Sequence, residues 1–268
     1  MTVVEDATIG RRAVEIISGE ISGGTNTSHT IVVGALADLL EAVSANAPQC
    51  AYVHAALEGN VLGKQTEGAR RRTFRYLKEL YLLRPDSVLF RALRDLWPVE
   101  NEARPLLAGL CALARDAVFR ASSVVIRASS PGERLTSGDL ADAVGGRFPA
   151  SYASSTLAKI GRNTFSSWEQ TGHLAAGDRA TKVRTRAACR PSDVAYALLL
   201  GHLQGVRGQA LFQTLWAEML DQPASRLYDL TATAAQQGML ELRHAGGVTE
   251  VTFRELLRPF DGEQGALL

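Results

Sequence analysis

The stretch from Leu135 to Arg190 constrains the fold more than any other part of the chain. Thr136 and Asp139 are typical of a helix start, and Gly145-Gly146 is expected to end that first short helix. The cap cluster Ser154-Ser155-Thr156 predicts the start of a second helix. Its apolar residues, Leu157, Ile160, Phe165 and Trp168, approximate helical spacing.

A short basic strand follows these two helices. The segment TKVRTRAACR alternates cations with smaller residues, and Gly177-Asp178 before it is a turn signal. Two helices joined by a turn and followed by a basic hairpin are the layout of a winged helix-turn-helix. We therefore expect a mainly α protein in which an N-terminal helical bundle precedes a winged helix-turn-helix domain with small β-hairpin wings.

The second helix of this stretch has polar side chains opposite its apolar residues, and they suit contact with DNA. We expect Arg162 and Asn163 to address base edges, because Arg pairs with guanine and Asn with adenine. The remaining residues are expected to contact phosphate or assist at the helix start: Ser154, Lys159, Thr164, Lys182, Arg184 and Arg186. The alternative is a helical hairpin that uses the same packing for protein contacts.

A second basic segment lies upstream, in GNVLGKQTEGARRRTFRYLKELYLL. Thr66 and Glu67 predict the start of a helix whose cations are Arg70, Arg71, Arg72, Arg75 and Lys78. An ordinary solvated helix mixes charges of both signs to gain ion pairs, whereas three consecutive arginines with one acid nearby do not. We expect Arg70, Arg71, Arg72 and Arg75 to form a second contact with the DNA backbone. The alternative is that acids elsewhere in the fold neutralise them.

Charge is distributed unevenly along the chain. The net charge of all 268 residues is only +1, but residues 59–84 and 159–190 each contain seven cations and two acids. The rest of the chain is therefore acidic. Two basic patches on an acidic body would repel a nucleic acid everywhere except at the patches, and so steer it onto them.

The chain is expected to divide into two domains. Residues 1–128 would form the helical bundle with its basic helix, including one long helix over 102–127 that is broken near Ser122-Ser123. The segment ASSPGE at 128–133 reads as a linker. Residues 134–260 would hold the winged domain, further helices, and a hairpin over 240–253 turning at Gly246-Gly247.

Several classes of protein are not supported by the sequence. The histidines are dispersed, and Cys50, Cys111 and Cys189 lack metal-binding spacing, so no metal or cofactor is expected. No phosphate-binding glycine motif or nucleophile elbow occurs, which argues against an enzyme. No apolar run reaches the length of a membrane span and no signal peptide is present, so we expect a cytoplasmic protein with no membrane partner.

The two basic regions together resemble the BrxA proteins of BREX bacteriophage-exclusion systems. The resemblance lies in NVLGKQTEGARRRTFRYLKELYLL, matching Asn60, Leu62 and the arginines from Arg70 to Arg75, and in the block from Ser154 to Leu174 with Lys159, Arg162 and Trp168. It implies a helical, non-enzymatic protein that binds double-stranded DNA and acts with a methyltransferase and ATPases. Two alternatives stay open: a protein-interaction adaptor of a defence complex, and a dimeric winged-helix transcriptional repressor.

Overall fold

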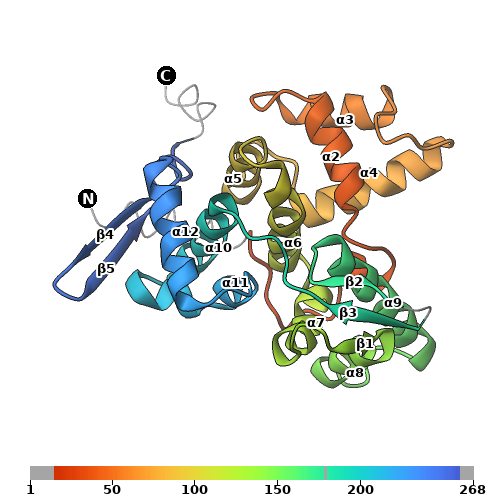
Figure 1. Cartoon of the computed structure of the whole chain (residues 1–268). Coiled ribbons are helices and arrows are strands. Elements are labelled where there is room, and N and C mark those ends of the chain that lie inside the picture. The colour runs from red at the N-terminus through yellow and green to blue at the C-terminus, as the bar shows by residue number, and fades with distance from the viewer. Residues whose placement is uncertain (1–14, 178–179, 260–268) are drawn as a thin grey trace.

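A computed structural model describes residues 15–177 and 180–259 and is mainly helical, as predicted (Figure 1). From residue 15 to Arg115 every regular element is a helix. A 3-10 turn precedes four α-helices, and a second 3-10 turn leads into a fifth: η1 (Thr25–Thr27), α2 (Val33–Ala42), α3 (Gln49–Leu57), α4 (Glu67–Tyr81), α5 (Val88–Leu96), η2 (Asn101–Ala103) and α6 (Arg104–Arg115).

The middle of the chain combines three helices with a three-stranded sheet. Its elements are α7 (Ala117–Ala128), β1 (Arg134–Thr136), α8 (Ser137–Arg147), α9 (Ser154–Gln170), β2 (Leu174–Ala176) and β3 (Thr181–Arg184). Strand β3 lies between β1 and β2 and is antiparallel to both, with Leu135 opposite Lys182 and Ala175 opposite Val183. The predicted basic strand is therefore present, and β1, which was not predicted, begins directly after the expected linker. Asp178 and Arg179 lie outside the described residues.

The last third of the chain has a related order of elements. It contains α10 (Pro191–Leu203), η3 (Gly208–Gln213), α11 (Leu215–Glu218), α12 (Ala224–Gln236), β4 (Glu241–Ala245) and β5 (Val248–Thr252). The predicted hairpin is confirmed, with Leu242 opposite Val251. Gly246 and Gly247 both have positive φ, as a tight two-residue turn requires.

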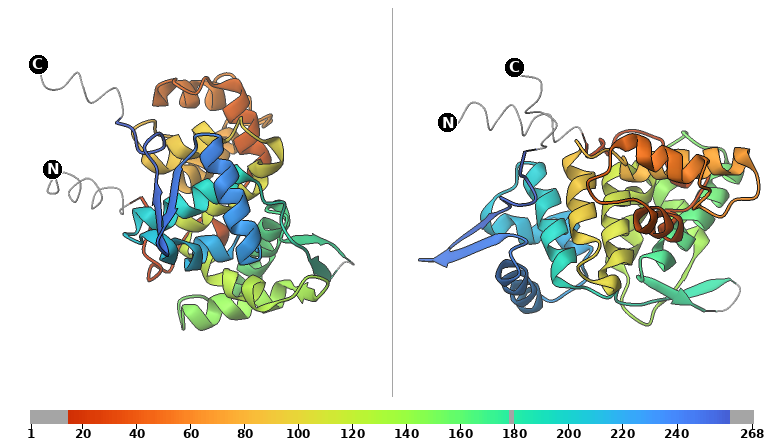
Figure 2. Two further views of the ribbon diagram at one scale, coloured as in Figure 1. Left: turned by 60° about the vertical axis from the view of Figure 1, so that its left-hand side comes forward. Right: turned by 90° about the horizontal axis from the view of Figure 1, so that it is seen from above.

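Helices α2–α4 and the unit α7–β3 lie at one end of the molecule, and α10–β5 lie at the other (Figures 1 and 2). The buried core is continuous between them, because Leu39, Leu107, Trp168, Leu198 and Val251 belong to one group of contacting apolar side chains. Helix α10 is buried on nearly every side, consistent with its uniformly apolar sequence. The domain boundary at 128–134 remains a prediction.

Two helix boundaries differ from the sequence-based expectation. The predicted long helix over 102–127 is two helices, and the break lies at Asp116 rather than at Ser122-Ser123. The Asp116 carboxylate accepts a hydrogen bond from the Phe119 amide at 2.8 Å and so begins α7 as its N-cap. Gly145 and Gly146 do not end α8, which continues to Arg147. The predicted start of α8 is confirmed by a capping box between Thr136 and Asp139.

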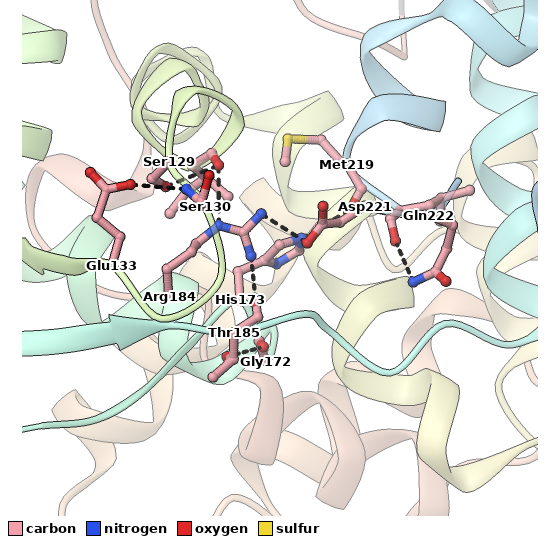
Figure 3. Close-up of polar contacts among 12 residues, drawn as sticks. Ser129, Ser130, Glu133, Gly172, His173, Arg184, Thr185, Met219, Asp221 and Gln222 are labelled. Carbon is pink, nitrogen blue, oxygen red and sulfur yellow. Dashed lines mark hydrogen bonds and ion pairs between the residues drawn. The ribbon is translucent and has the colours of Figure 1, made fainter. Parts of the chain in front are cut away.

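Arg184 joins the middle of the chain to the C-terminal end (Figure 3). Its side chain is 3% exposed, and Nη2 lies 2.9 Å from the Asp221 carboxylate. Its Nε donates to the Ile126 carbonyl at 3.1 Å, at the end of α7. Next to it, the buried His173 ring contacts the Met219 carbonyl through Nε2 at 2.9 Å. The prediction that Arg184 contacts phosphate is therefore wrong, because its guanidinium is buried and its charge is already paired.

Replacing Arg184 with Ala should lower the free energy of unfolding by about 3 kcal/mol, because it leaves Asp221 beside a partly buried void without its cation. Urea unfolding followed by circular dichroism measures this. Arg186→Ala is the matched control: its side chain is exposed, and among the described residues it makes no hydrogen bond or ion pair. The control should stay within about 0.5 kcal/mol of the native protein. Equal losses in the two variants would contradict the structural role of Arg184.

The buried His173 should make the protein less stable in mild acid. Burial lowers the pKa of His173 to about 4, whereas the unfolded chain titrates near its ordinary value. The unfolded state therefore binds more protons between about pH 6.5 and 4, and stability falls as the pH drops through that window. Comparing urea unfolding of the native protein and His173→Gln at both ends of the window isolates this residue. The native protein should lose more stability than the variant, and parallel losses would contradict the assignment.

Candidate nucleic-acid interface

Helix α9 presents one polar stripe to solvent. The stripe consists of Ser155, Lys159, Arg162, Ser166 and Glu169, which are exposed or half-exposed and follow alternating steps of four and three residues. That spacing places them along one face of the helix. Among the described residues, neither Lys159 nor Arg162 makes a hydrogen bond or ion pair. Ser154 is exposed in the first turn, while the residue in the N-cap position is Ala153 rather than a residue of the predicted cap cluster.

Asn163 and Thr164 do not belong to this exposed stripe. The Asn163 amide nitrogen donates to the main-chain carbonyl of Asn26 at 3.0 Å, so it faces the η1 segment rather than solvent. Thr164 is fully buried, and its hydroxyl bonds back to the Ile160 carbonyl within the helix at 2.9 Å. The role of Asn163 in reading adenine stays a prediction, although its amide nitrogen is already engaged with Asn26.

The segment around η1 joins α9 to α4. Ser167 on α9 donates to the Asn26 side-chain oxygen at 2.7 Å and accepts from the Ile31 amide at 3.2 Å. On the other side, the Tyr81 hydroxyl donates to the Ile31 carbonyl at 2.5 Å, at the end of α4. The upstream basic helix and α9 are thus fixed relative to each other through residues 25–33.

Cations from both helices meet around His29. The His29 ring lies against Tyr76 of α4, with ring centroids 4.8 Å apart. Its pKa is lowered, first by burial and then by the positive charges of Lys64, Arg72 and Lys159. Among the described residues these three cations have no carboxylate partner. With Arg162 they form what we call the cationic face: Lys64, Arg72, Lys159 and Arg162.

The other predicted cations of α4 point elsewhere. Arg70 is half-buried, and its Nε is buried without a hydrogen-bond partner among the described residues. Arg71 pairs with Glu67 at 2.5 Å, and Arg75 lies 3.6 Å from Glu79. Both pairs are exposed, so they contribute little to stability and leave the arginines accessible. The α4 arginines therefore do not form one contact, and only Arg72 joins the cationic face.

The cations of the hairpin β2–β3 add little to this face. Lys182 is 16% exposed, because its ammonium lies 2.6 Å from Glu169 and 4.5 Å from the centre of the Phe165 ring. Arg186 is exposed, but it lines a cavity beside Arg127, Glu218 and Asp221, at the junction with the C-terminal end. The three predicted residues therefore do not act together. Lys182 is covered by Glu169 and Phe165, Arg184 is buried, and Arg186 lies away from the cationic face.

Sequence reasoning missed three residues of this region. Lys64 was noticed only as part of a basic segment, and His29 and Asn26 only within a turn-forming cluster, SGGTNTSHT. The run of small polar residues signals an irregular segment, but no local pattern indicates that this segment is buried between two helices. No helix in the described part of the chain is long and apolar enough to cross a membrane. The described residues also contain no cluster of three potential metal ligands.

Comparisons with protein-family models, with curated proteins and with solved structures find nothing that matches this chain.

The convergence of cations on His29 can be measured directly. Arg72→Gln and Lys159→Gln should each raise the pKa of His29, because each removes a positive charge that opposes its protonation. Titration of the His29 ring protons by NMR measures the effect, and added salt should raise the pKa in the same direction by screening. Arg186→Gln should leave the titration unchanged. If Lys159→Gln does not move it, α9 and α4 do not share this surface.

Proposed function

We propose that the protein binds double-stranded DNA through the cationic face and does so as a non-enzymatic accessory protein of a bacteriophage-defence system. The observation that carries the proposal is that the segment holding His29 is hydrogen-bonded to both α4 and α9, while Arg72 and Lys159 of these helices have no carboxylate partner among the described residues and both act on His29. The net charge of the chain is only +1, so a duplex would not be attracted to the whole surface. Most other cations in the described residues contact a carboxylate or carbonyl group, which leaves the cationic face as the surface that a duplex would prefer.

The order of elements from α7 to β3 supports a winged-helix reading of this region. A helix, a strand, two helices and a two-stranded hairpin, with the three strands in one antiparallel sheet, follow the order of a winged helix, in which α9 would be the recognition helix. Arg162 is at the centre of the exposed stripe of α9, where it can reach guanine edges in the major groove. Lys159, Arg72 and Lys64, the three cations that act on His29, are proposed to contact phosphates.

The defence role rests on the sequence resemblance to the BrxA proteins. That resemblance centres on the segment from Asn60 to Leu83 and on the block from Ser154 to Leu174. These are the two segments that supply the cationic face. The proposed partners are accordingly duplex DNA and, within a cytoplasmic BREX-like system, its methyltransferase and ATPase components.

Neutralising the cationic face should weaken duplex binding and its dependence on salt. Arg72→Gln, Lys159→Gln and Arg162→Gln should each cost about 1 kcal/mol or more, and loss of a phosphate contact should reduce the slope of log K against log salt by about 1. Fluorescence anisotropy with a labelled duplex across a salt series gives both values. Arg186→Gln removes the same charge elsewhere and should leave both unchanged.

Two outcomes would contradict the proposal. Equal weakening by Arg186→Gln would mean that binding follows total charge rather than this surface. Unchanged binding in a combined Arg72→Gln, Lys159→Gln and Arg162→Gln variant would remove the cationic face from the mechanism.

A further inference from the structure

A separate groove runs along the other side of α4. It encloses about 540 Å³ between α4, the end of α3 and the end of α6. Arg71, Arg75 and Lys78 line it from α4, at steps of four and three residues that place them on one helix face. Arg72 is offset from them by about a quarter of a turn. Helix α4 thus divides its cations between the cationic face and this α4 groove.

The positive charge in the α4 groove is only partly neutralised. Four cations line it, but Arg71 pairs with Glu67 and Arg75 lies 3.6 Å from Glu79, which leaves Lys78 and Arg115 without a carboxylate partner among the described residues. Lys78 makes no hydrogen bond or ion pair within the described residues. The Arg115 guanidinium donates to two main-chain carbonyls, those of Glu79 at 3.3 Å and Glu15 at 2.6 Å, and to no carboxylate. Burial lowers the pKa of Arg115, although Cys111 and Glu15 partly oppose this effect, and an added carboxylate would further stabilise its charged form.

The groove also has an apolar floor. Phe74 of α4 and Leu57 at the end of α3 line it between the cations. The phosphates of a duplex would not cover these two apolar side chains, and a small inorganic anion would leave them exposed to water. A protein segment that carries an apolar side chain between carboxylates would complement both features. A volume of about 540 Å³ accommodates side chains of this size, since ligand pockets span about 300–1,000 Å³.

We propose that the α4 groove binds an acidic segment of a partner protein. An apolar side chain of that segment lies on Phe74 and Leu57, and flanking carboxylates pair with Lys78, Arg75 and Arg115. Charge complementarity selects the acidic partner, and the open rim formed by exposed residues of α4 suits a peptide chain. This surface is distinct from the cationic face, so the protein can hold DNA and a partner protein at the same time.

The test uses the full chain and a short fluorescein-labelled peptide rich in Glu with one central Phe and one central Leu. Fluorescence anisotropy should show tighter binding of this peptide than of two controls, one with Gln in place of Glu and one with Ser in place of Phe and Leu. Lys78→Glu should weaken peptide binding about tenfold, equivalent to about 1.4 kcal/mol. Leu57→Gln should weaken it as well while leaving the charge of the groove unchanged.

Arg72→Glu is the matched control, because it makes the same change of charge on the same helix, about a quarter of a turn away from the groove. Arg72→Glu should change peptide binding by no more than about twofold and should weaken duplex binding. Lys78→Glu should weaken peptide binding and leave duplex binding unchanged. The proposal is overturned if the native protein does not prefer the acidic apolar peptide, or if Arg72→Glu and Lys78→Glu weaken it equally. Loss of duplex binding in Lys78→Glu, with the peptide unaffected, would assign the groove to DNA instead.

Discussion

The buried contact between Asn26 and Asp116 determines where the cations of this protein lie. The Asn26 main-chain and side-chain nitrogens both donate to one Asp116 carboxylate oxygen, at 2.8 and 3.0 Å. The other carboxylate oxygen caps α7. Burial raises the pKa of Asp116, and these donors oppose that effect by stabilising the carboxylate. One side chain thereby separates α6 from α7 and anchors the η1 segment against both α7 and α9.

The same contact explains a glycine next to Asn26. A Cβ atom on Gly24 would lie 2.2 Å from the Asp116 carboxylate, so only glycine allows the chain to pass this close. From there the segment continues to α4, where Glu79 accepts a hydrogen bond from the Thr25 hydroxyl at 2.8 Å. The cationic face therefore results from a buried polar network. Its cations have no carboxylate partner among the described residues, while Glu79 accepts from Thr25 and Glu169 pairs with Lys182.

Local sequence signals predicted much of the fold, because capping residues and turn glycines act over a few positions. The Thr136–Asp139 capping box and the Gly246-Gly247 hairpin are examples. The candidate site was harder to predict, because the orientation of a polar residue depends on distant partners. Alternation placed Lys182 and Arg184 on one face of a strand, but could not show that this face turns inward. The partner of Arg184, Asp221, lies thirty-seven residues away in the sequence. Asn163 likewise has its partner in a segment that sequence reasoning treated as a turn.

The distance between α3 and α9 tests most directly whether one rigid body carries the cationic face. Spin labels on the exposed native Cys50 and on Ser155→Cys, with Cys189 replaced by Ser, report that distance by pulsed electron resonance. The doubly labelled protein with native Asn26 should give a single narrow distribution of spin-label distances. Asn26→Ala should broaden that distribution while the protein keeps its helical circular dichroism. A broad distribution in the native background, or one that Asn26→Ala leaves narrow, would contradict the account.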